Sequence, residues 1–128
     1  MQNSGKQMEL ICVQKNGKCG YINQKKQVII PLKYDCAWSF QENGLAGVKN
    51  SGKWGCVNQK GEEVIPCIYD RMLNFAKNGL AVAVVNGRFG YIDENNNQIV
   101  ACEHKNESGA KAEMMSKMNG KSVTITMF

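Results

Sequence analysis

Short apolar runs of four to seven residues alternate along the chain with polar turn residues. The runs are rich in Val, Ile, Tyr and Trp and are bounded by Gly, Asn and Ser, which is typical of β-strands joined by tight turns. Asn16-Gly17 and Asn86-Gly87 are dipeptides that favour two-residue hairpins, because both central residues of such a turn need positive φ. The pattern therefore predicts an all-β chain of short antiparallel hairpins.

The pattern repeats every 35 residues, without a gap, from residue 10 to residue 105. The segment at 16–22 matches 51–57 and then 86–92, and later segments of each copy keep the same register. Three copies predict a repeat protein in which each copy buries its apolar face against the next. We place the copies at about 8–39, 40–74 and 75–105, within a single domain.

Three columns of the repeat are aliphatic in every copy, which marks them as core positions. They are Ile22, Val57 and Ile92; Ile30, Ile65 and Val100; and Leu10, Leu45 and Leu80. A second turn is predicted at Lys26, Gly61 and Asn96. Both faces of the middle strand carry apolar groups, so we expect the meander to curl into a solenoid or a barrel-like sheet that covers both faces.

Glycine recurs inside the predicted middle strand, at Gly20, Gly55 and Gly90. Glycine within a strand costs roughly 0.5–1 kcal/mol relative to alanine, so its presence in all copies needs a physical reason. We expect either an aromatic ring that lies over the bare backbone or a bulge that bends the strand. The candidate rings are Trp54, Phe89, Tyr34 and Tyr69.

The middle copy combines Gly52-Lys53-Trp54-Gly55 with Val64-Ile65-Pro66, Tyr69-Asp70 and Asn78-Gly79-Leu80-Ala81. This combination resembles the WG-containing repeat family, which is built from bacterial repeats of about this length, over residues 8–105. Only the middle copy keeps the Trp, and the third copy lacks the Pro and the Tyr-Asp pair, as suits terminal repeats. The resemblance implies a binding or structural scaffold and carries over no catalytic residue.

The repeat ends after residue 105, and a different pattern follows. Ala110, Met114 and Met118 lie at helical spacing and predict one short helix, whereas residues 121–128 alternate apolar and polar side chains and predict a strand. An array of strands must be closed at its end, so we interpret residues 106–128 as a C-terminal cap of a helix and a strand. The alternative is that the methionines form a partner surface.

Size and composition exclude several classes of protein. The 128 residues suit one domain, and 43% hydrophobic with 21% charged residues excludes general disorder. No apolar run approaches the roughly 20 residues that span a bilayer, and residues 1–7 show no signal-peptide pattern. We therefore expect a cytoplasmic protein with no membrane contact, whose net charge of +5 mildly favours anionic partners.

The titratable residues suggest structural roles. Six cysteines could form three disulfides in a secreted protein, but without a Cys-x-x-Cys pair or histidine at zinc spacing we expect free, packed thiols and no metal or cofactor. His104 stands in the column of Tyr34 and Tyr69 and is predicted to pack as they do. Asp35 and Asp70 follow those tyrosines and are expected to cap the N–H groups of turns.

Two basic columns and one connecting segment supply the candidate binding residues. The basic columns are Lys18, Lys53 and Arg88, and Lys25 and Lys60. Stacked repeats would align each column into a row that could meet phosphates or an acidic protein; the alternative is that lysine simply suits an exposed turn. Trp38, which has no aromatic counterpart, is a candidate binding anchor, and Arg71 lies in the matching segment.

No catalytic motif or phosphate-binding glycine loop is recognisable, so we expect no enzyme. The leading hypothesis is a non-enzymatic protein-binding module, a monomer or small homo-oligomer, that presents a rigid repeat surface. Its partner would be another protein, with a larger nucleic-acid-handling complex as one candidate. Two alternatives stay open: nucleic-acid binding through the basic row, and a small phage-type, anti-CRISPR-like inhibitor of a host defence nuclease.

Overall fold

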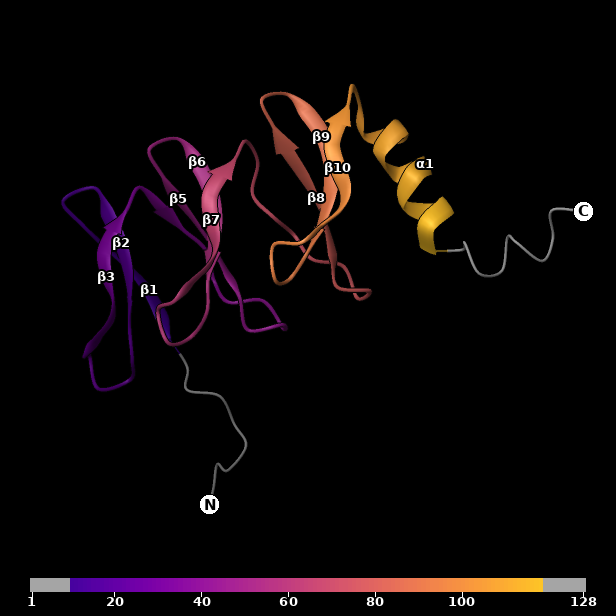
Figure 1. Ribbon diagram of the computed structural model, residues 1–128. Helices are drawn as coiled ribbons and strands as arrows, with labels where there is room; N and C mark the ends of the chain where they lie inside the picture. Colours follow the sequence, from indigo (N-terminus) through magenta and orange to yellow (C-terminus); the bar gives the residue numbers. More distant parts are fainter. Residues whose placement is uncertain (1–9, 119–128) are drawn as a thin grey trace, which may run out of the picture. The chain divides into compact units, whose positions relative to one another are not determined.

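The computed structural model describes residues 10–118 of the chain, which form ten strands and one helix (Figure 1). The elements are β1 (Ile11–Lys15), β2 (Lys18–Ile22), β3 (Val28–Tyr34), β4 (Cys36–Ala37), β5 (Ala46–Asn50), β6 (Lys53–Val57), β7 (Glu63–Tyr69), β8 (Leu80–Val85), β9 (Arg88–Asp93), β10 (Gln98–His104) and α1 (Glu107–Met118). The strand predicted over 121–128 lies outside the described residues.

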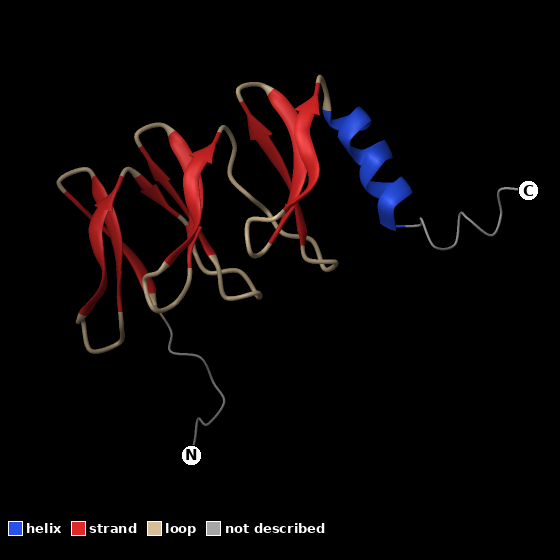
Figure 2. Ribbon diagram, in the orientation of Figure 1, coloured by secondary structure: helices blue, strands red, loops and turns tan. Residues whose placement is uncertain are grey.

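The strands form three antiparallel sheets, about one for each copy of the repeat, except that β4 at the end of the first copy pairs with β5 in the second sheet (Figure 2). The strand orders are β1-β2-β3, β4-β5-β6-β7 and β10-β9-β8, and residues 10–118 contain no closed barrel. The period of 35 residues reappears in the strand register. The matching pairs are Val13 with Gly20, Val48 with Gly55, and Ala83 with Gly90. The predicted β-hairpin repeat is confirmed, and the barrel-like alternative is not found.

The chain divides into two compact units, one ending at Cys67 and the other beginning at Ile68. In the first unit, Tyr21, Ile30 and Tyr34 pack with buried side chains of β5 and β6. In the second unit, the buried cluster contains Leu80, Tyr91, Val100 and Ala110.

Seven of the nine predicted column residues are at most 8% exposed, which confirms the columns as core positions. Leu10 and Ile22 are only half-buried, so the prediction is wrong for these two. Both belong to the first copy, and residues 10–118 contain no sheet before β1 that could cover them.

Both predicted turns are present in every copy. The hairpin turns use positive φ, as at Asn16 (54°) and Gly17 (78°). The second turn has its positive φ at Lys26 (66°) and at the two matching residues. The side chain of Asn23, three residues earlier, holds this turn. Its amide oxygen Oδ1 accepts hydrogen bonds from the backbone N–H groups of Lys25 and Gln27 at 2.9 Å. Asn58 and Asp93 do the same in the other copies.

The recurring strand glycine is explained by the backbone of the neighbouring strand and not by an aromatic ring. A Cβ on Gly55 would lie 2.7 Å from the carbonyl oxygen of Pro66 and closer still to that of Ile65. Gly20 and Gly90 face the equivalent carbonyl groups in their own sheets. The register shifts between β2 and β3 and between β9 and β10, so the expected bulge accompanies the close approach. The expectation of a covering ring is wrong.

The C-terminal helix starts earlier than the apolar spacing predicts. It begins at Glu107 because the Asn106 side chain accepts the backbone N–H of Gly109 at 2.8 Å and so caps the first turn. Ala110 is fully buried and Met114 packs beside it, but Met118 is 52% exposed and does not continue the apolar stripe. Within residues 10–118, no helix is long and apolar enough to cross a bilayer.

Candidate functional site

Two aspartates hold the hairpin turns. The Asp35 carboxylate accepts the backbone N–H of Ser51 at 2.9 Å, and the Asp70 carboxylate accepts that of Gly87 at 2.8 Å. This confirms the predicted turn-capping role. Asp35 also accepts a hydrogen bond from the Lys18 ammonium at 2.6 Å. The Lys18 hydrogen bond, together with that from Ser51, lowers the pKa of Asp35.

The predicted basic residues occupy two kinds of position. Lys18, Lys53 and Arg88 stand at the first residue of β2, β6 and β9, and Lys25 and Lys60 lie exposed in the second turn. The Lys18 charge is offset by Asp35, whereas Lys53 is half-buried. The alignment of these side chains into one continuous row stays a prediction.

Trp38 follows β4 and exposes 53% of its surface. Its backbone is firmly held, because its N–H donates to the carbonyl of Gly47 at 3.0 Å and its carbonyl accepts the hydroxyl of the buried Tyr21. A large ring on a fixed backbone loses little conformational entropy when it binds a partner, which is the property of a binding anchor.

The first unit contains a groove of about 870 Å³ whose lining includes Ser39, the residue that follows Trp38 in the chain. Leu10, Ile11 and Phe40 supply its apolar side chains, and the Phe40 ring packs 5.0 Å from that of Tyr21. The polar lining consists of Ser39, Gln41, Glu42, Asn43, Asn58, Gln59 and Lys60. An apolar base with amide and charged groups around it suits a peptide or protein surface better than a bare phosphate backbone.

Sequence reasoning missed this groove, although it found Lys60 and the neighbouring Trp38. The segment 39–44 and the turn 58–60 are 14 or more residues apart, and only the folded first unit brings them together. One signal in the sequence could have found them. The 40–46 segment recurs at 75–81, and its residues before Leu45 belong to none of the three core columns, so they are candidates for lining a surface site.

Arg71 lies in the second unit and is not among the residues that line the groove. Its guanidinium carbon stands 5.2 Å from the centroid of the Phe89 ring, a cation–π geometry. With Met72, Val82 and Glu107 it borders a small hollow of about 200 Å³. The stacking gives Arg71 a structural partner.

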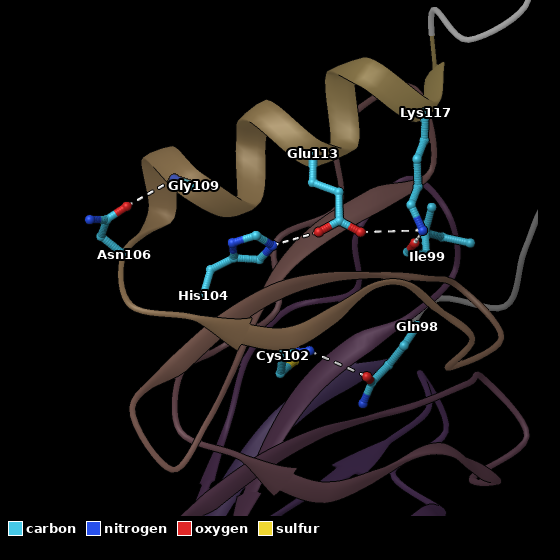
Figure 3. Close-up of polar contacts among 8 residues, drawn as sticks. All are labelled: Gln98, Ile99, Cys102, His104, Asn106, Gly109, Glu113 and Lys117. Atoms are coloured by element: carbon cyan, nitrogen blue, oxygen red, sulfur yellow. Dashed lines mark hydrogen bonds and ion pairs between the residues drawn. The ribbon is translucent and has the colours of Figure 1, made fainter.

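His104 makes polar contacts that fasten α1 to the third sheet (Figure 3). Its Nε2 lies 2.6 Å from Glu113 Oε1, and the other Glu113 oxygen lies 3.3 Å from the Lys117 ammonium. Lys117 in turn donates to the carbonyl of Ile99 at 2.9 Å. The half-buried ring also packs under Gly109, where a Cβ would lie 3.1 Å from His104 Nδ1. His104 therefore packs as predicted and adds a hydrogen-bond role that the sequence did not indicate.

The repeat geometry has a counterpart among known families. The model of the WG containing repeat matches residues 20–54 and 54–89, more than half of the chain. The chain belongs to the WG-containing repeat family. The two matches meet at Trp54, beside the glycine that approaches the neighbouring strand in each sheet. No curated protein and no solved structure matches the chain.

The WG-repeat chain is expected to lose helix docking when Glu113 is neutralised. The His104 hydrogen bond is the largest cause that lowers the pKa of Glu113, with Lys117 contributing further. A carboxylate whose pKa is lower in the folded chain than in the unfolded chain stabilises the fold. This contribution is fully present at pH values above the unfolded pKa, and it is lost as the pH falls through the folded pKa. Glu113→Gln should therefore reduce amide protection of α1 at pH 6, measured by hydrogen exchange, and the difference from the wild type should shrink as the pH falls through the folded pKa of Glu113. Equal protection at pH 6 would contradict this role.

All six cysteines of the WG-repeat chain are free thiols. Burial is the largest cause that raises the pKa of Cys56 to about 12 and that of Cys67 to about 11. Within residues 10–118, no three His, Cys, Asp or Glu side chains could together hold a metal ion. The buried thiols serve as small apolar packing groups.

We expect Cys56 and Cys67 to react with a thiol reagent at pH 8 only when the chain unfolds, because the thiolate is the reactive form. Because the pKa of each thiol is higher in the folded chain than in the unfolded chain, the thiols stabilise the fold at pH values below the unfolded pKa. This contribution is lost as the pH rises through the folded pKa values. Peptide mapping after timed alkylation measures this, with urea-unfolded chain as the control. Labelling of Cys56 in the native chain as fast as in urea would refute the assignment.

Proposed function

We propose that this WG-repeat chain is a non-enzymatic protein-binding module whose repeats stack into a solenoid and hold the first-unit groove rigid. The observation that carries the proposal is the exposed Trp38, which has a fixed backbone and directly precedes the groove-lining segment 39–44 with its apolar Phe40. Binding energy at protein interfaces concentrates in such aromatic anchors surrounded by polar groups. The partner would place an apolar side chain against Phe40 and polar groups toward the amides and Lys60.

The other two functions make different demands on the same surface. Nucleic-acid binding would need free basic charge in a row, and the Asp35–Lys18 pair supports it less than a protein partner. An inhibitor of a host defence nuclease is a special case of protein binding, in which the groove would take a surface of that enzyme.

Affinity capture from native lysate with mass spectrometry tests the proposal, using the wild type and Trp38→Ala at low and high salt. We expect a partner protein that survives high salt and is lost with Trp38→Ala. Ile68→Ala is the matched control, since Ile68 is 45% exposed in the second unit. Capture of nucleic acid alone, lost at high salt, would favour the basic row instead, and a captured nuclease that loses activity would favour the inhibitor.

Two further measurements address the remaining parts of the proposal. Small-angle X-ray scattering should give the elongated profile of a stacked repeat, and a spherical profile would contradict the solenoid. Turnover of any substrate that one point substitution abolishes in a folded chain would contradict the non-enzymatic assignment.

A further inference from the structure

The first sheet has an aliphatic face that is largely open to solvent. Ile11 pairs with Ile22, and Ile22 pairs with Val28, so the three side chains form a row across β1, β2 and β3. Val13 shares this face by strand alternation. We call Ile11, Val13, Ile22 and Val28 the first-sheet face. Ile11 is 50% and Val28 58% exposed, and the other two are half-buried.

Three of these four positions are covered in the other two sheets, whereas Glu63 and Gln98, the counterparts of Val28, are exposed. In the second sheet, Ala46, Val48 and Val57 match Ile11, Val13 and Ile22, and each is 0% exposed. They pack there against Tyr21, Ile30 and Tyr34, which the first repeat contributes to the core. The third-sheet counterparts are at most 1% exposed: Ala81, Ala83 and Ile92. The part of the first-sheet face formed by Ile11, Val13 and Ile22 is therefore a surface on which a β-layer packs in the second sheet, and Val28 lies at its rim.

We propose that the first-sheet face is a self-association surface, through which two copies of the chain pack face to face about a twofold axis. A head-to-tail contact would need the side of the third sheet that carries Tyr91 and Val100, the counterparts of Tyr21 and Ile30. Ala110 and Met114 of α1 already pack against that side. A second copy therefore finds only the same face, which makes the contact isologous and closed.

The chemistry of the face allows a second copy as its occupant. Its four side chains are uncharged, so two identical faces can meet without repulsion at their centre. The nine residues before Leu10 contain only two apolar side chains, Met1 and Met8, which match four aliphatic residues poorly. Lysines flank the face, with Lys15 at the β1–β2 turn and Lys25 at the β2–β3 turn. Repulsion between these edges would be screened by salt, so association should strengthen as salt rises.

The size of the face sets the strength of the dimer. Three strands of about five residues cover roughly 15 Å by 17 Å at ordinary strand spacing and rise. That is well below the roughly 800 Å² per partner of a stable interface, so association should be weak and should need a high protein concentration.

Sedimentation velocity of the full chain between about 10 μM and 1 mM, at low and high salt, tests the proposal. We expect the weight-average mass to rise from monomer toward dimer, and more so at high salt. Val28→Lys should weaken association at least about tenfold while the melting temperature stays the same, because Val28 is mostly exposed. The matched control is Trp38→Lys, which places the same charge on an equally exposed residue outside the face and should leave association unchanged.

A monomer at 1 mM in both salts would overturn the proposal, as would Val28→Lys chains that associate like the wild type. Association that weakens with salt, or that Trp38→Lys abolishes, would point to a different surface. Association that appears only after removal of residues 1–8 would show that this segment is the occupant. The first-sheet face shares Ile11 with the groove, but Val28 does not line the groove and Trp38 does not belong to the face, so Val28→Lys should leave capture of the groove partner intact and Trp38→Ala should leave dimerisation intact.

Discussion

Val57→Asp is expected to abolish folding. Val57 is 0% exposed and lies in the core cluster of the first unit with Ile30 and Tyr34. A carboxylate there would have no partner, and burying an unpaired charge costs about 3–5 kcal/mol, which is comparable to the whole stability of a domain at the lower end of the usual range of about 5–15 kcal/mol. Circular dichroism during thermal melting should show no cooperative transition.

Val28→Asp is the matched control for this prediction. It makes the same change on a β3 valine that is 58% exposed, so its melting temperature should lie close to that of the wild type. A Val57→Asp chain that melts as cooperatively as the control would mean that the column is not part of the core.

Gly55→Ala is expected to destabilise the chain by about 3 kcal/mol, although alanine is only one methyl larger. The added Cβ would meet the backbone carbonyls of Ile65 and Pro66, which cannot rotate away as a side chain could. Strands β6 and β7 would have to separate. Urea unfolding measures the change as a lower midpoint.

Gly17→Ala separates this clash from the general cost of replacing a turn glycine. Gly17 has φ 78° and nothing within 4 Å of its would-be Cβ, so only the left-handed backbone is penalised, by about 1 kcal/mol. Equal losses for the two variants would show that the close approach at Gly55 is absent.

The sequence predicts the fold far better than the candidate site because the repeat supplies three readings of each position. The Asn16-Gly17 turns and the aliphatic columns follow from rules that act within a few residues or from the repeat itself. Asp35 capping follows from the turn preference of aspartate, although the N–H that it caps belongs to Ser51 in the next copy. The reason for Gly55 could not be read in the same way. Either a ring or a backbone can exclude a Cβ, and only the paired strands show that it is the backbone of Pro66.

Sites that depend on unique contacts were harder to predict. Trp38 stands out as a non-repeating aromatic, but the groove lined by the residue after it joins segments that carry no motif. The His104–Glu113 contact depends on where α1 starts, and the Asn106 cap moves that start away from the apolar stripe. Exposure of the first-sheet face followed from its place in the first copy, where Ile22 lacks the cover that Val57 has.

Cross-strand nuclear Overhauser effects test most directly whether the 35-residue period builds three equivalent hairpins. The structure predicts strong contacts between the backbone protons of three pairs, each 35 residues from the next: Val13 with Gly20, Val48 with Gly55, and Ala83 with Gly90. Contacts shifted by one residue in any copy, or helical chemical shifts in these segments, would contradict the repeat architecture.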